Sequence, residues 1–143
     1  MQETFAMATD LTVISFKAEA HPIQFLRTKA FRRDAERFFS EEELIGFMNY
    51  IAANPDSGDK IPGRSGLRKL RWKAKGFGKR GGARVIYFFR DLNMPLLLLA
   101  VYAKNEQARL SADEMKAIER KMNEIISKQM TSEAGRKQSD RSA

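Results

Sequence analysis

The stretch that decides the fold begins as Leu67-Arg-Lys-Leu-Arg-Trp-Lys73 and continues as Ala83-Arg-Val-Ile-Tyr-Phe-Phe-Arg90 and Pro95-Leu-Leu-Leu-Leu-Ala-Val-Tyr-Ala103. The first segment alternates apolar and basic side chains, which is typical of a strand with one face in a core. The second is rich in β-branched and aromatic residues. The third is almost entirely apolar, as expected of a strand buried on both faces. Together the three segments predict a meander of strands.

Two helices precede this meander. Thr28 can cap a helix over residues 28–39, in which the apolar side chains recur at helical spacing. Ser40 and Glu43 have the spacing of a capping box, so a second helix is expected to begin there and to end near Asn54. Two helices that meet at a serine cap predict a helical hairpin.

A third helix follows the meander. Ser111 and Glu114 repeat the capping-box spacing and predict a helix to about residue 128. Alternation over residues 23–27 adds a strand before the hairpin. The expected fold is therefore α+β: a small antiparallel sheet of about four strands packed against a helical hairpin, plus a C-terminal helix.

The chain divides into one domain with two tails. Residues 1–20 show little pattern and are expected to be an N-terminal extension, although residues 11–16 could equally form a short strand. Residues 21–128 are expected to form the domain, and residues 129–143 a disordered polar tail.

Composition narrows the class of function. The formal net charge of +8 points to a polyanionic partner, although many basic proteins bind nucleic acid only nonspecifically. The chain has no cysteine and one histidine, so thiolate chemistry and a multi-histidine metal site are excluded, and we expect no metal or cofactor. The longest apolar run, residues 95–102, is far shorter than the roughly 20 residues of a membrane helix. We expect a cytoplasmic protein.

Cations gather on two neighbouring strands. Residues 60–90 contain eleven lysine and arginine residues and no acidic residue. Adjacent strands lie about 5 Å apart, so Lys69 and Arg71 on one strand and Arg84 on the next can converge on one phosphate. The alternative is a solvated basic face that only binds. The expected contacts to RNA or the ribosome are Arg68, Lys73, Lys75, Phe77, Lys79, Arg80 and Asn105.

The chemistry of such a site favours RNA. No general base stands out, and Glu41, Glu42 and Glu43 are explained by capping. A phosphoryl-transfer site built from cations must work by positioning and charge stabilisation. RNA supplies its own nucleophile in the 2′-hydroxyl, whereas DNA cleavage needs an external nucleophile and usually metals.

Three motifs in order resemble one family. They are Gly58-Asp-Lys-Ile-Pro-Gly-Arg-Ser-Gly-Leu-Arg-Lys-Leu-Arg-Trp72, Gly78-Lys-Arg-Gly-Gly-Ala-Arg-Val-Ile-Tyr87, and Val101-Tyr-Ala-Lys-Asn-Glu106 followed by Leu110-Ser111. Over residues 24–126 the chain resembles the RelE superfamily of toxins in its HigB-like branch. The resemblance implies an mRNA interferase, a ribosome-dependent endoribonuclease that cuts messenger RNA in the A site without metal and leaves a 2′,3′-cyclic phosphate. It also implies a neutralising antitoxin, often one with a helix-turn-helix domain.

The resemblance carries over to particular residues. Arg84 matches the family arginine that opens the third strand, and Lys69 with Arg71 matches its paired basic residues, where a one-residue slip would substitute Arg68. Lys104 and Asn105 occupy the place of a further basic pair, from which asparagine departs. The resemblance thus implies Lys69, Arg71, Arg84 and Lys104 as catalytic residues.

Three questions stay open at the level of sequence. A lysine or Tyr102 is the available general base, and Tyr102 could instead stack a base. A related ParE-like toxin would use the same fold against DNA gyrase. A catalytically inactive module that binds nucleic acid or an antitoxin is the third alternative.

Overall fold

The computed structural model describes residues 11–17, 22–73 and 82–142. Its elements are β1 (Leu11–Lys17), β2 (Pro22–Thr28), α2 (Lys29–Phe38), α3 (Glu41–Ala53), β3 (Asp59–Lys60), β4 (Arg68–Trp72), β5 (Ala83–Phe88), β6 (Leu96–Ala103) and α5 (Ala112–Ser142). The α+β class, the helical hairpin and the C-terminal helix are confirmed. None of the described helices is long and apolar enough to cross a membrane.

The sheet differs from the prediction in size and direction. Six strands pair in the order β1-β2-β6-β5-β4-β3, and β2 runs parallel to β6, with Phe25 opposite Leu96. Part of the predicted N-terminal extension forms β1, which pairs antiparallel with β2. The expectation of an antiparallel sheet of about four strands is therefore wrong in both respects. The reason is that alternation reports which face a side chain takes but not the direction of the neighbouring strand.

One threonine joins the sheet to the helical hairpin. The Thr28 hydroxyl accepts a hydrogen bond from the Phe31 amide at 3.1 Å, which caps α2. The same hydroxyl donates to the Leu99 carbonyl at 3.0 Å, directly beyond the last parallel pair, Arg27 and Leu98. Thr28 is buried, so both bonds are shielded from water. A single side chain thus ends the β2–β6 ladder and begins α2.

The hairpin covers one face of the sheet. The predicted capping box of α3 is present, with the Ser40 amide donating to Glu43 Oε1 at 2.8 Å and the Glu43 amide donating to Ser40 Oγ at 3.1 Å. Phe47 of α3 is fully buried and packs edge-on against Trp72 of β4, with ring centroids 5.5 Å apart. Burial of such a ring stabilises the fold by about 1.5–3 kcal/mol. These contacts fix α3 against β4.

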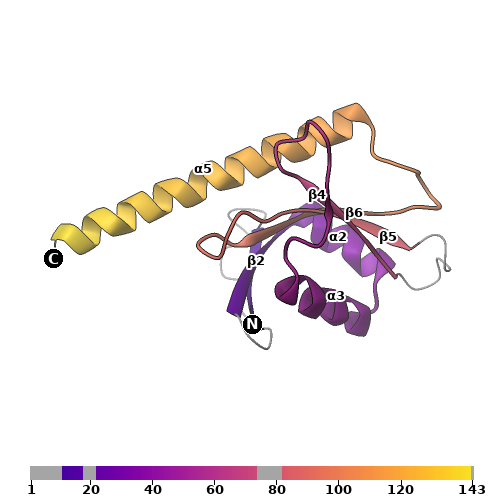
Figure 1. The fold of residues 1–143 in the computed structure, drawn as a ribbon, viewed down its shortest axis with the longest axis horizontal. Helices are drawn as coiled ribbons and strands as arrows, with labels where there is room; N and C mark the ends of the chain where they lie inside the picture. The colour runs from indigo at the N-terminus through magenta and orange to yellow at the C-terminus, as the bar shows by residue number, and fades with distance from the viewer. Residues whose placement is uncertain (1–10, 18–21, 74–81, 143) are drawn as a thin grey trace.

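Helix α5 covers the other face and extends past the sheet (Figure 1). Its residues Met115, Met122 and Ile125 are buried in a second apolar cluster with side chains of the sheet. Residues 129–142, for which the sequence predicted a disordered tail, continue this helix. Lysine, glutamine, glutamate and arginine favour helix, and no proline interrupts the segment. The sheet therefore lies between the helical hairpin and α5.

Candidate active site

Three strands bring two arginines and a tyrosine into one row. Arg71 of β4 is the register partner of Arg84 of β5, and Arg84 is the register partner of Tyr102 of β6. Side chains of directly opposed residues lie on the same face of a sheet, with about 5 Å between neighbouring strands. Arg71, Arg84 and Tyr102 therefore form a continuous row, which we call the cationic row.

Lys69 lies beside this row on the same face. It is two residues from Arg71 along β4 and is paired with Ile86 of β5. Ile86 and Tyr102 both belong to the apolar cluster that α5 covers, so the cationic row lies on the α5 side of the sheet. The strand register therefore places Lys69, Arg71 and Arg84 next to one another on one face of the sheet, as predicted.

Arg68 lies on the opposite face. It is paired with Tyr87, whose ring belongs to the apolar cluster under the helical hairpin. The Arg68 guanidinium donates hydrogen bonds to the carbonyls of Asp56 and Gly58 at 3.0 and 2.7 Å. The one-residue slip that would put Arg68 beside Arg84 does not occur, and Arg68 instead holds the loop before β4.

Arg84 is held in an unfavourable electrostatic environment for a cation. Its pKa is lowered from the ordinary value, first by burial and then by the positive charge of Arg71, while Tyr102 acts in the opposite direction. Two neighbouring guanidinium groups repel one another in this partly desolvated position. An anion bound over them would relieve the repulsion, and guanidinium groups match phosphate oxygens in bidentate geometry.

The Tyr102 phenol is subject to the charges of this cation and of a carboxylate, Glu114. Burial raises the pKa of the Tyr102 phenol; the Arg84 cation lowers it and the Glu114 carboxylate raises it. Tyr102 shares its apolar cluster with Met115, which follows Glu114 in the first turn of α5. Sequence reasoning assigned Glu114 to capping alone, because nothing in the linear pattern places residue 114 next to residue 102.

A backbone hydrogen bond just beyond the ends of β5 and β6 positions Lys104. The Lys104 amide donates to the Gly82 carbonyl at 3.2 Å, which continues the pairing past the strand ends. Gly82 has φ +58°, and a Cβ there would lie 2.7 Å from the Trp72 carbonyl oxygen, so only glycine fits. Lys104 and Asn105 are exposed in the turn that follows β6. They adjoin the Tyr102 end of the cationic row in sequence.

The remaining predicted contacts are only partly described. Lys73 is exposed at the end of β4. Four predicted residues lie outside the described part of the chain: Lys75, Phe77, Lys79 and Arg80.

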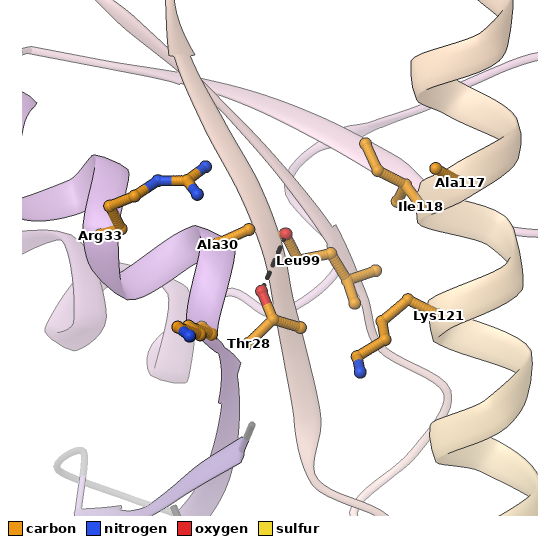
Figure 2. Close-up of a pocket in the computed structure, with 8 residues that line it drawn as sticks. Thr28, Ala30, Arg33, Leu99, Ala117, Ile118 and Lys121 are labelled. Carbon is orange, nitrogen blue, oxygen red and sulfur yellow. Dashed lines mark hydrogen bonds between the residues drawn. The ribbon is translucent and has the colours of Figure 1, made fainter. Parts of the chain in front are cut away.

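A pocket of about 400 Å³ lies elsewhere, between α2 and α5. Figure 2 shows Thr28 and Arg33 on one side, Ile118 and Lys121 on the other, and Leu99 of β6 between them. No residue of the cationic row lines this pocket. The candidate site is therefore the sheet surface around the row, and nucleic acid binds such open basic surfaces readily.

No model of a known protein family matches this chain.

Proposed function

We propose that this protein is a metal-independent endoribonuclease that cleaves messenger RNA on the ribosome. The observation that carries the proposal is the register of Arg71, Arg84 and Tyr102 across β4, β5 and β6, with Lys69 beside them. Such a row presents fixed positive charge and a phenol to one phosphodiester.

The chemistry asked of these residues is modest. The RNA 2′-hydroxyl attacks its own phosphate, so the protein must orient the ribose and neutralise charge on the pentacoordinate phosphorus. Arg84 and Lys69 bind the phosphate oxygens, while Arg71 and Lys104 contribute further charge stabilisation. Guanidinium groups occupy the place where a Mg²⁺ site would need carboxylates. Removal of one such donor costs on the order of 100-fold in rate.

The resemblance to RelE/HigB-like toxins supports the wider setting of the proposal. On that basis the protein is the toxin of a type II toxin–antitoxin pair, acts in the cytoplasm, and inhibits translation. An antitoxin with a helix-turn-helix domain neutralises it. Growth arrest on expression of the protein alone, relieved by co-expression of the neighbouring gene, is the expected behaviour.

Mapping the 5′ ends of cellular messenger RNA after brief induction tests the proposed function. Cuts within codons and in the reading frame are expected for the wild type and absent for Arg84→Ala. Intact messenger RNA with a DNA-damage response would instead identify a gyrase-directed toxin. Salt-dependent RNA binding without cleavage on translating ribosomes would identify an inactive binding module.

A further inference from the structure

The candidate site has two chemically different ends. At the β4 end lie the cations Lys69 and Arg71, and at the β6 end lies the Tyr102 phenol. Two strand spacings, about 10 Å, separate the ends, with Arg84 between them. Transfer through a pentacoordinate phosphorus keeps the attacking and leaving oxygens on opposite sides. A phosphate over Arg84 therefore has one oxygen toward each end of the row.

A carboxylate extends the β6 end. Glu114 lies in the first turn of α5, and the burial of Met115 in the apolar cluster of Tyr102 anchors this turn of the helix against β6. Glu114 Oε1 accepts hydrogen bonds from the Ser111 amide at 2.8 Å and from Gln107 Nε2 at 3.4 Å. These contacts hold the carboxylate in one orientation, and Glu114 is exposed, so substrate can reach it.

The charge of Glu114 is set by its capping contacts and acts on Tyr102. The hydrogen bond from the Ser111 backbone, first among several, lowers the pKa of Glu114 below its ordinary value. The carboxylate is therefore ionised at neutral pH, and because the same shift makes it a weaker base, its role depends on its position rather than on its basicity. Its charge also acts on the Tyr102 phenol, which Arg84 faces from β5.

We propose that Glu114 is the general base of the cleavage, and that the RNA lies with its 2′-hydroxyl at the β6–α5 end and its leaving 5′-oxygen at the β4 end. This inference rests on the proposed function and names the proton acceptor that the sequence did not reveal. Tyr102 orients the ribose between Glu114 and Arg84.

Each proton and bond has a place in this arrangement. The 2′-hydroxyl gives its proton to the Glu114 carboxylate as the 2′-oxygen forms its bond to phosphorus. The bond from phosphorus to the 5′-oxygen breaks, and the departing electron pair takes a proton from the Lys69 ammonium. The products are a 2′,3′-cyclic phosphate and a 5′-hydroxyl, and solvent restores both side chains.

The chain contains its own matched control. Glu43 holds the same position in the capping box of α3 that Glu114 holds in that of α5, but it lies on the other side of the sheet. Glutamine preserves a capping box, so Glu114→Gln and Glu43→Gln remove the same charge from equivalent helix positions. On ribosomes carrying a synthetic messenger RNA, Glu114→Gln should slow single-turnover cleavage at least about 100-fold. Glu43→Gln should cleave within about twofold of the wild type, since it is remote from the row.

The direction of the RNA is tested with a substrate in which sulfur replaces the bridging 5′-oxygen at the cleaved position. A thiolate leaves without protonation, so this substrate should restore the rate of Lys69→Ala but not that of Glu114→Gln. Rescue of Glu114→Gln with no rescue of Lys69→Ala would reverse the assignment.

The two proposals fail in different ways. If wild-type protein does not cut ribosome-bound RNA, the proposed function fails. If the wild type cuts and Glu114→Gln cuts equally fast, the nuclease stands and the role of Glu114 is refuted.

Discussion

Arg84 and Tyr102 are register partners across the β5–β6 ladder, and each shifts the pKa of the other. The cation lowers the pKa of the phenol, and Tyr102 in turn counteracts the lowering of the arginine's pKa. This pair connects the cations of β4 and β5 to the polar residues of β6 and α5. Substitution at either position therefore changes the electrostatics of the whole site.

Arg84→Ala should slow cleavage strongly without loss of stability. Burial and Arg71 both disfavour the Arg84 cation in the folded state, so its removal should leave the melting temperature equal or slightly higher. The cleavage rate on ribosomes should fall on the order of 100-fold or more. Arg120→Ala, at an exposed position on α5, is the control for lost charge. Full activity in a folded Arg84→Ala protein would remove the cationic row from the mechanism.

Two substitutions at Tyr102 should separate the contribution of its ring to stability from the contribution of its hydroxyl to cleavage. Tyr102→Phe keeps the buried ring and should change the free energy of unfolding by less than about 1.5 kcal/mol, yet slow cleavage at least about 10-fold. Tyr102→Ala also leaves a cavity in the apolar cluster and should cost about 3–5 kcal/mol of stability. Urea unfolding and single-turnover cleavage measure the two effects. A fully active Tyr102→Phe protein would show that the hydroxyl does not act.

The Glu119 carboxylate should make the stability of the folded protein fall as the pH is lowered into the acid range. Its carboxylate accepts hydrogen bonds from Arg64 at 2.9 Å and from Ser65 Oγ at 3.1 Å, which tie the β3–β4 connection to α5. The hydrogen bond from Arg64 is the largest cause of the lowered pKa of Glu119. A carboxyl with a lowered folded pKa stabilises above its unfolded pKa and loses this contribution as pH falls through the folded pKa.

The corresponding experiment compares melting temperatures at pH 7 and in acid. Glu119→Gln should melt below the wild type at pH 7, and the difference should shrink below the ordinary glutamate pKa of about 4.3. Glu124→Gln, at an exposed α5 position without a salt bridge or side-chain hydrogen bond to the described residues, should show no such convergence. A pH-independent difference would mean that the carboxylate charge is not what ties the connection to α5.

Two glycines should respond in opposite directions to the same substitution. A Cβ at Gly58 would lie 2.7 Å from the ring and hydroxyl of Tyr87, which accepts the Gly58 amide hydrogen bond at 2.8 Å. Gly58→Ala should therefore destabilise by about 1–3 kcal/mol. Gly46, on α3, has no atom within 4 Å of an added Cβ, so Gly46→Ala should stabilise by about 0.5–1 kcal/mol. Urea unfolding measures both.

Local patterns predicted the local structure well. Alternation in β4 correctly separated Lys69 and Arg71 from Arg68, because successive side chains of a strand take opposite faces. The capping boxes at Ser40 and Ser111 correctly marked helix starts, because those hydrogen bonds join residues three apart.

Contacts between segments that are distant in the chain could not be predicted from the sequence. The parallel pairing of β2 with β6 depends on where the helical hairpin returns the chain, and no residue pattern encodes that direction. The proximity of Glu114 to Tyr102 depends on how α5 lies across the sheet. A capping role fully accounted for Glu114 in the sequence, so its second role had no separate signal.

The bond between Thr28 and Leu99 joins residues 71 positions apart. During synthesis the N-terminal elements emerge first, so β2 and the helical hairpin leave the ribosome before their partner strand exists. The centre of the sheet can close only after β6 has emerged, and the candidate site also needs the start of α5. The proposed nuclease therefore acquires its activity only after the ribosome has translated β6 and the start of α5.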